Sequence, residues 1–496
     1  MNRSGKRDSE RPRAIIDIGS NTIRLVVYGN PPRAPHVLHN EKTVARLGRD
    51  LSRTGKIPGK AAKLGLDVLR RFARLIEELR IDDVEAVATA AVRDAKNGAD
   101  FLEKVRELGF APRLLSGNEE AQASADGVLG AFPDARGVVA DLGGGSLELM
   151  EIDHENRGNG TTLPLGTLRL PSLPANKGKK AAIAKVIEKS GFRAAKGETL
   201  YLVGGTLRAF GRLAMIEMKS PLEDPHGFVL EAGDARRIAK RFARRKADKI
   251  AGIEEISSSR KEMIGDASAL VGALLGEFEP DRVVFSAWGL REGLLMQRLP
   301  SELRVQDPLL SAVTAYAARR DVTAQTGAMV AGWISGLPGA RAEGTERLRL
   351  VTAMLALASQ RLEPNIRRRH ALDWALHKRW IGLEPGIAPS SPPRCSRRPG
   401  GPSCPTSSRC SQARTISPRV WLGGSAFACC ADSAAQRSPR SPAACCASTA
   451  RNLCSPCRPR RCRCAVPGPR RTCPPSRAIS VSSLRSNGER HSDRVQ

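Results

Sequence analysis

The chain has 496 residues, enough for two or three domains with their own cores, and its apolar content of 41% is ordinary for a globular protein. Its formal net charge of +29 is unusual and indicates a polyanionic partner such as nucleic acid, a membrane surface or another polyanion. The N-terminal residues have no apolar core, and the chain has no apolar run of about 18 residues. We therefore expect no signal peptide, no spanning helix and a cytoplasmic location.

The excess charge is concentrated at one end of the chain. The segment from Pro385 to Gln496 has 19 Arg, no Lys and 3 acidic residues, which gives it +16 and leaves +13 for the rest. All 12 Cys also lie there, between Cys395 and Cys473. The rest of the chain therefore has no disulfide framework and no thiol chemistry.

The first predicted element is a hairpin that follows a polar segment, residues 1–12, which we expect to be disordered. In Ala14-Ile-Ile-Asp17-Ile-Gly19-Ser-Asn-Thr-Ile-Arg-Leu-Val-Val27, two apolar runs flank a short turn of small and polar residues. A loop is expected over 48–56, helices over 61–79 and 99–108, and a strand over 84–90.

Three charged residues stand out in the N-terminal part of the chain. Arg93, after the strand over 84–90, could hold a phosphate through its bidentate fork or be a solvated surface residue. Glu119 and Glu120 open a helix, where acidic residues commonly serve capping and the helix dipole.

The second hairpin, Asp141-Leu-Gly-Gly-Gly-Ser-Leu-Glu148, lies between the apolar runs 137–140 and 149–152. Three consecutive glycines let backbone N–H groups form a concave nest for an anion, and phosphate is a common guest. Two carboxylates beside such a nest would repel a phosphate unless a cation such as Mg²⁺ lies between them. A plain tight hairpin, with glycines for geometry alone, is the simpler alternative.

The two hairpins align without a gap, with Asp17 on Asp141 and Gly19 on Gly143. A repeat of this size implies two similar α/β domains, each with a phosphate-binding hairpin. If the hairpins face each other, they form one cleft for a polyanion. The domain boundary is expected near residues 125–137.

A third glycine turn follows the apolar strand 200–203, where Gly204-Gly205-Thr206 precedes a helix over 207–216. The N-terminus of a helix is an anion site.

Basic helices are expected over 177–189 and 235–247, a buried helix over 263–278 and a strand over 283–286. Arg291, in Gly289-Leu-Arg-Glu-Gly293, could, like Arg93, hold a phosphate or be a solvated surface residue. Four further helices are expected over 309–318, 326–334, 347–362 and 367–380.

Beyond about residue 383 the sequence consists of Arg, Ser, Pro, Ala, Gly and Cys without hydrophobic periodicity. A native low-complexity tail is one account, and a zinc site at Cys454, Cys457, Cys462 and Cys464 is another, although the second ligand pair has the wrong spacing. We favour a third account, in which a frameshift near codons 381–390 replaced the end of the helical domain. Resequencing tests it, because an intact frame through residue 400 contradicts it.

The motifs, in this order and spacing, resemble the exopolyphosphatase and guanosine pentaphosphate phosphohydrolase (Ppx/GppA) family from about Arg13 to Leu299, and more loosely to Gly382. They are Asp17 to Thr22, Ala88 to Arg93, Leu115 to Ala121, Asp141 to Glu148, Gly204 to Thr206 and Gly289 to Gly293.

The resemblance implies an α/β fold with two ribonuclease H-like domains of the actin and sugar kinase type around a cleft. It gives domains at 13–130 and 131–303, an incomplete helical domain resembling HD phosphohydrolases at 304–382, and the tail at 383–496.

The resemblance also implies site roles. Glu120 matches the residue that acts on the attacking water, while Asp141, Glu148 and Asp17 match positions near Mg²⁺. The phosphate-binding positions that it implies are Gly19, Ser20, Asn21, Arg93, Gly143, Gly144, Gly145, Ser146, Gly205 and Thr206. Gln122 departs from the basic residue that many members carry there.

The expected activity is hydrolysis of the terminal phosphoanhydride of inorganic polyphosphate, with Mg²⁺ as cofactor. Removal of the 5′ γ-phosphate of guanosine pentaphosphate is the nearest alternative, and ATP binding by an actin-like protein is another. We expect no membrane and no specific nucleic acid as partner, although the Arg-rich tail could bind RNA, and we consider a homodimer.

Overall fold

The structure is a computed structural model. It describes residues 11–154, 156–173, 178–220, 222–336 and 345–383. The tail with its candidate zinc ligands, and most of the N-terminal segment expected to be disordered, lie outside the described residues.

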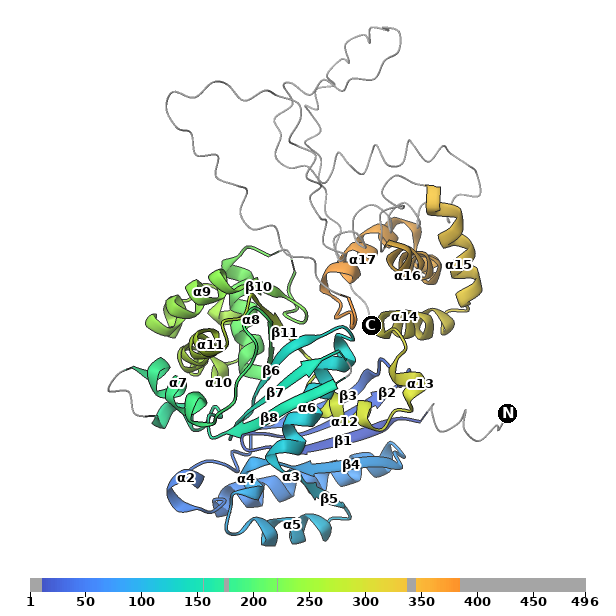
Figure 1. Ribbon diagram of the computed structural model, residues 1–496. Helices are drawn as coiled ribbons and strands as arrows, with labels where there is room; N and C mark the ends of the chain where they lie inside the picture. The colour runs from blue at the N-terminus through green and yellow to red at the C-terminus, as the bar shows by residue number, and fades with distance from the viewer. Residues whose placement is uncertain (1–10, 155, 174–177, 221, 337–344, 384–496) are drawn as a thin grey trace, which may run out of the picture. The chain divides into compact units, whose positions relative to one another are not determined.

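Two β-sheets with the same central topology form the α/β part of the chain (Figure 1). In each sheet three consecutive strands form an antiparallel meander, and a parallel strand lies on the other side of the first of them. The first sheet has the order β3-β2-β1-β4-β5 and the second β10-β11-β9-β6-β7-β8. The internal repeat expected from the sequence is therefore present as a repeat of strand order.

The strands of the first sheet are β1 Arg13–Ile18, β2 Ile23–Gly29, β3 His36–Thr43, β4 Asp83–Ala88 and β5 Pro112–Leu114. Those of the second are β6 Arg136–Leu142, β7 Leu147–Asp153, β8 Asn156–Leu163, β9 Thr199–Val203, β10 Val229–Glu231 and β11 Arg282–Phe285. The sequence did not predict β3, β8 or β10.

Alternation along β1 explains why the first sheet is covered on both faces. Successive side chains of a strand point to opposite faces. Ile16 and Ile18 accordingly belong to one apolar cluster, with residues of α3 (Gly59–Glu78) and α5 (Gly98–Arg106). Ile15 belongs to a second cluster, with residues of α6 (Gly117–Ala131) and α12 (Leu290–Gln297).

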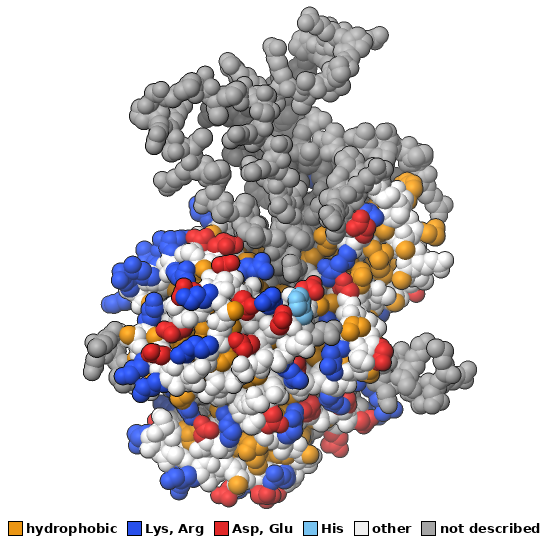
Figure 2. Space-filling view, viewed as in Figure 1, with side chains coloured by type: hydrophobic (Ala, Val, Ile, Leu, Met, Phe, Trp, Pro, Cys, Tyr) orange, Lys and Arg blue, Asp and Glu red, His pale blue; other side chains and the backbone are white. Residues whose placement is uncertain are grey.

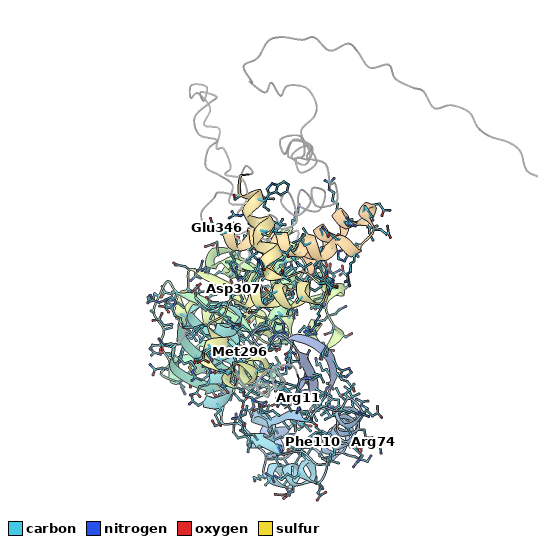
Figure 3. The ribbon with its side chains drawn as sticks, turned by 90° about the vertical axis from the view of Figure 1, so that its right-hand side faces the viewer. Arg11, Arg74, Phe110, Met296, Asp307 and Glu346 are labelled. Carbon is cyan, nitrogen blue, oxygen red and sulfur yellow. The ribbon has the colours of Figure 1, made fainter. Side chains whose placement is uncertain are left out.

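The second apolar cluster joins the two sheets. It contains side chains of β1 and β2 together with Met150 of β7 and Tyr201 of β9, and α6 and α12 contribute to it from both halves of the sequence. Helix α6 packs against β7 and β8. Met296 of α12, labelled in Figure 3, belongs to the same cluster. The two lobes thus share a core built around one helix pair.

A third cluster covers the other face of the second sheet. The helices of this lobe are α7 Lys179–Lys189, α8 Gly205–Glu217, α9 Ala232–Arg244, α10 Ser258–Lys261 and α11 Ile264–Phe278. Basic side chains gather over α9 on the face that Figure 2 shows. Two short helices, α2 (Leu51–Thr54) and α4 (Ala90–Arg93), occur in the first lobe, and α2 lies where the sequence predicted a loop.

Beyond α12 the chain is helical, as the sequence predicted. After the short α13 (Ser301–Arg304) come α14 Pro308–Ala318, α15 Ala324–Trp333, α16 Thr345–Ala358 and α17 Pro364–His377. These helices have an apolar cluster of their own that includes Leu309, Val351 and Trp380. Their likeness to HD phosphohydrolases stays a prediction. In the described part of the chain, no helix is both long and apolar enough to cross a bilayer.

Candidate active site

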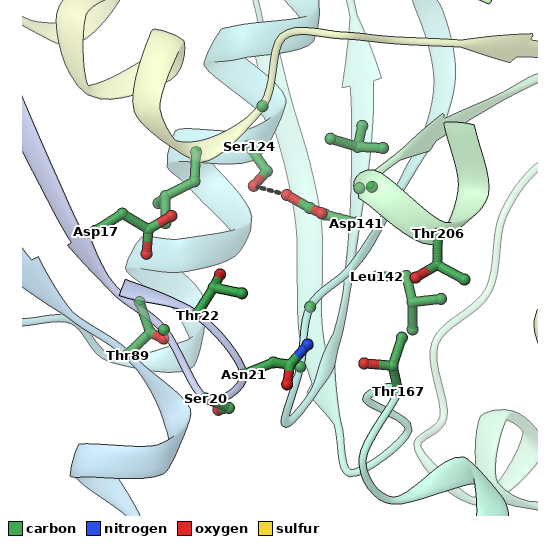
Figure 4. Close-up of a pocket in the computed structure, with 18 of the residues that line it drawn as sticks. Asp17, Ser20, Asn21, Thr22, Thr89, Ser124, Asp141, Leu142, Thr167 and Thr206 are labelled. Carbon is green, nitrogen blue, oxygen red and sulfur yellow. Dashed lines mark hydrogen bonds between the residues drawn. The ribbon is translucent and has the colours of Figure 1, made fainter. Parts of the chain in front are cut away.

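A cavity of about 210 Å³ lies where the two glycine hairpins and the start of α8 come together. It is lined by 13 of the 14 residues to which the resemblance gave a catalytic, metal or phosphate role, which are Asp17, Gly19, Ser20, Asn21, Glu120, Asp141, Gly143, Gly144, Gly145, Ser146, Glu148, Gly205 and Thr206. Figure 4 shows Asp17 and Asp141 on opposite sides of this space. Residues far apart in sequence thus meet in one polar pocket.

The two hairpin turns have matching geometry and touch each other. In the first, the Gly19 N–H donates to the Thr22 carbonyl oxygen at 3.0 Å, and in the second the Gly143 N–H donates to the Ser146 carbonyl oxygen at 3.0 Å. A Cβ on Gly144 would lie 2.8 Å from the Asn21 nitrogen, closer than a side chain tolerates. The glycine at 144 is therefore required for the close approach of the two turns.

The helix that opens with two glutamates gives each of them a different environment. Glu119 completes a capping box, in which its carboxylate accepts from the Ser116 N–H at 2.8 Å and its own N–H donates to the Ser116 hydroxyl at 3.2 Å. Glu120, one residue later, is buried and lines the cavity. The capping interpretation therefore holds for Glu119, and Glu120 is the candidate for chemistry.

Burial raises the pKa of the Glu120 carboxyl to about 7, and the nearby acids Asp17 and Asp141 add to the shift. Arg93 opposes it by pairing with the Glu120 carboxylate. Arg93 also donates to the Leu115 carbonyl oxygen at 2.8 Å. Arg93 itself is not among the described residues that line the cavity, so its role as a phosphate ligand stays a prediction.

The three carboxylates assigned to a metal have raised pKa values, chiefly because they are buried. Asp141 accepts a hydrogen bond from the Ser124 hydroxyl at 2.5 Å, and Asp17 is paired with Arg291. Glu148 Oε1 is buried and has no hydrogen-bond partner among the described residues. Among these carboxylates, it is the oxygen that is both fully buried and without a hydrogen-bond partner in the described part of the chain.

The all-oxygen chemistry of these groups fits Mg²⁺, which is usually held by one or two carboxylates, waters and substrate phosphates. The assignment of these three carboxylates to a metal stays a prediction. Among the described residues, no three Asp, Glu, His or Cys side chains lie close enough together to hold a metal ion. Asp17, Asp141 and Glu148 therefore do not form a complete protein cage, and phosphate oxygens and water would have to supply the remaining ligands.

Five cationic side chains line the same cavity, and the sequence had offered only one of them, Arg291, as a candidate. They are Arg24, Lys42, Arg208, Arg260 and Arg291. Burial and, after it, neighbouring arginines lower the pKa of Arg208 to about 10. The pKa of Lys42 is also lowered, by burial and then by four surrounding arginines. Mutual repulsion of this kind is relieved when an anion binds.

Part of this cationic set has a signal in the sequence. When the repeat is aligned on Asp17 and Asp141, Arg24 falls on Glu148, and the strand pairing confirms the match, since Asp17 pairs with Arg24 and Asp141 with Glu148. Equivalent positions of the two hairpins thus carry opposite charges into the same cavity. The positions of Lys42 and Arg260, on β3 and α10, have no comparable signal.

Fold and site together define a two-lobed α/β protein of the actin-like class, with two glycine-containing turns and a buried acid in one cleft. Residues 26–302, more than half of the chain, match the model of the Ppx/GppA phosphatase family, and the chain belongs to this family. The resemblance drawn from the motifs is thereby confirmed.

Named relatives agree with this assignment. The chain is 28% identical over 303 residues to exopolyphosphatase 1 of Mycobacterium tuberculosis. The alignment covers 58% of this chain and 88% of the relative. It is 26% identical over 303 residues to guanosine-5′-triphosphate,3′-diphosphate pyrophosphatase of Aeromonas hydrophila, covering 57% of this chain and 58% of the relative. Both names describe hydrolysis of phosphoanhydrides, so the chain is a hydrolase acting on phosphorus-containing anhydrides.

A solved structure shows the same fold. The crystal structure of an exopolyphosphatase from Cytophaga hutchinsonii superposes with a TM-score of 0.51 at 22% identity, covering 57% of this chain and 96% of that one.

Proposed function

We propose that the protein is an exopolyphosphatase, which hydrolyses the terminal phosphoanhydride of inorganic polyphosphate and releases orthophosphate. The observation that carries the proposal is the buried Glu120, with a pKa of about 7, in a cavity lined by two phosphate-binding turns and five cations. A general base works best with a pKa near the operating pH.

In the proposed reaction, the Glu120 carboxylate orients a water molecule and accepts its proton as the oxygen attacks the terminal phosphorus. The bond between that phosphorus and the bridging oxygen breaks, and the shortened chain leaves with the electron pair. Phosphoryl transfer depends mainly on positioning and on neutralising charge. The glycine turns and the cavity cations serve these two needs. Mg²⁺ bound near Asp141, Glu148 and Asp17 would neutralise charge on the non-bridging oxygens.

Two observations favour polyphosphate over guanosine pentaphosphate. The chain covers 88% of the length of the named exopolyphosphatase but 58% of the named guanosine pentaphosphate relative. In addition, none of the described residues that line the cavity is aromatic. A guanine base is commonly held by stacking on an aromatic ring, whereas polyphosphate needs only anion-binding groups.

Phosphate release with Mg²⁺ tests the proposal, with long-chain polyphosphate and guanosine pentaphosphate offered in parallel. We expect a higher kcat/KM for polyphosphate. A higher kcat/KM for the nucleotide would assign the protein to the alternative activity, and a folded protein without release from either substrate would contradict both.

The pH dependence of kcat/KM should report Glu120. As a base it must be deprotonated, so the rate is expected to fall as the pH drops below about 7, the pKa given by burial. The pairing with Arg93 lowers this pKa, so replacing Arg93 with glutamine should raise it and move the acidic limb to higher pH. A pH–rate profile of both proteins with the same substrate checks this, because the substrate's own ionisation is identical in the two. An unmoved limb would show that the titrating group is not Glu120.

A further inference from the structure

Each hairpin aspartate is held by one side chain of the helix pair that joins the lobes. Ser124 of α6 donates from its hydroxyl to Asp141 Oδ2 at 2.5 Å, as Figure 4 shows. Arg291 of α12 donates from Nη1 to Asp17 Oδ2 at 3.2 Å. Both aspartates line the cavity, as does Glu120, which lies one helical turn before Ser124. The same two helices therefore carry the candidate base and the groups that hold the two acids.

Glu292, the residue next to Arg291 on α12, is held by a buried network that reaches back to the first lobe. The Tyr28 hydroxyl, on β2, donates to Glu292 Oε1 at 2.6 Å, and the Gly289 N–H donates to Glu292 Oε2 at 3.2 Å. Tyr28 and Glu292 are 3% and 8% exposed, so water competes little for these bonds. Burial disfavours the charged form of Arg291, but Glu292, Tyr28 and Asp17 favour it, and the net effect raises the pKa of Arg291. Tyr28 does not line the cavity formed by the described residues.

We propose that Arg291 and Ser124 are positioning residues that fix the two hairpin aspartates relative to Glu120, and that Tyr28 acts on Asp17 through Arg291. The inference rests on the proposed function for its kinetic test. A side chain that positions a reacting group affects kcat, whereas one that binds the phosphate chain affects KM. Small misplacements of reacting groups can cost about 100-fold in rate.

A double-mutant cycle on Tyr28→Phe and Arg291→Met tests the coupling. With polyphosphate as substrate, we expect Arg291→Met to lower kcat by about 10- to 100-fold with KM changed less than about twofold. Tyr28→Phe should lower kcat by about 3- to 10-fold in the wild-type background and have no further effect in Arg291→Met. Arg291→Lys, which keeps the charge, should recover part of the loss. Ser124→Ala should also lower kcat with little change in KM.

Tyr201→Phe is the matched control, because it removes another buried tyrosine hydroxyl, from β9, outside the cavity lining. It should leave kcat unchanged. If the loss of kcat in the double variant equals the product of the losses in Tyr28→Phe and Arg291→Met, the two residues act independently. That result would overturn the action of Tyr28 through Arg291. A large rise of KM with an unchanged kcat in Arg291→Met would make Arg291 a phosphate ligand and overturn its positioning role.

Hydrogen–deuterium exchange of the substrate-free protein gives a readout that does not depend on turnover. Amides of residues 17–24 should exchange faster in Tyr28→Phe and Arg291→Met than in the wild type and in Tyr201→Phe. If the wild type releases no phosphate from either substrate, the proposed function fails and exchange alone decides the inference. Unchanged exchange in both variants would overturn it.

Discussion

Replacing Glu120 with glutamine is expected to lower kcat for phosphate release by about 10²- to 10⁴-fold, the usual contribution of a general base. Glutamine keeps the size of the side chain but cannot accept the proton of the attacking water. It also removes a buried carboxylate whose charged form is disfavoured, so the variant should be at least as stable as the wild type above pH 7. Steady-state kinetics and a thermal melt at pH 8 measure the two effects.

The neighbouring residue supplies the control. Glu119→Gln makes the same chemical change on the same helix, but the Glu119 carboxylate caps the helix through Ser116, pairs with Arg113 and does not line the cavity. Its kcat should stay within about twofold of the wild type, and any loss should be of stability, about 1 kcal/mol or less. Equal losses of kcat in the two variants would point to a disturbed helix α6 and would remove Glu120 from the proposed mechanism.

Replacing Gly293 with alanine is expected to destabilise the fold by about 3 kcal/mol, at the upper end of the cost of overpacking. Gly293 lies on α12 where this helix crosses α6, and an added Cβ would stand 1.6 Å from the Ala123 carbonyl oxygen. Backbone cannot move aside as a flexible side chain can, so α12 would have to shift away from α6. Because α12 also holds Arg291, the variant should lose activity together with stability. Chemical denaturation and phosphate release measure the two losses.

Gly272→Ala is the corresponding control. Gly272 lies within α11, and the nearest atom to its added Cβ would be Lys180 Cδ at 3.7 Å, an ordinary contact. Alanine is the better helix former by up to about 1 kcal/mol, so this variant should be unchanged or slightly more stable. A Gly293→Ala variant as stable as the wild type would show that the crossing of α6 and α12 is looser than the structure describes.

The sequence predicts the two hairpins well because their signal is local and occurs twice. Asp17 and Asp141 are the next-to-last residues of β1 and β6 and pair in the same register, so the repeat alone indicates two similar lobes. Strand β8 was missed for the opposite reason. Most of its residues, Asn156–Leu163, are polar or glycine and exposed, so they carry no hydrophobic alternation.

The charge environment of the site could not be predicted, because tertiary contacts create it. The resemblance assigns a role to Glu120 and not to Glu119, but the burial of Glu120 that raises its pKa comes from the folded structure. Lys42 and Arg260 lie on elements with no phosphate motif and reach the cavity because of how the lobes fold. Arg291 had two interpretations from its motif, and its contact with Asp17, 274 residues away, is invisible to any local pattern.

The contacts of Asp17 with Arg291 and of Tyr28 with Glu292 join distant parts of the sequence, which matters while the chain is being synthesised. Asp17 and its partner Arg291 are 274 residues apart in the sequence, and Tyr28 and its partner Glu292 are 264 residues apart. At a synthesis rate of about 5–20 residues per second, the first hairpin is synthesised roughly 15–55 s before its partner residues on α12. The first sheet also lacks part of its core until α12 is made, since Leu294 and Met296 pack in the same cluster as Ile15. A chain that ends before α12 would therefore contain both hairpin turns, and we expect it to be unable to hydrolyse a phosphoanhydride.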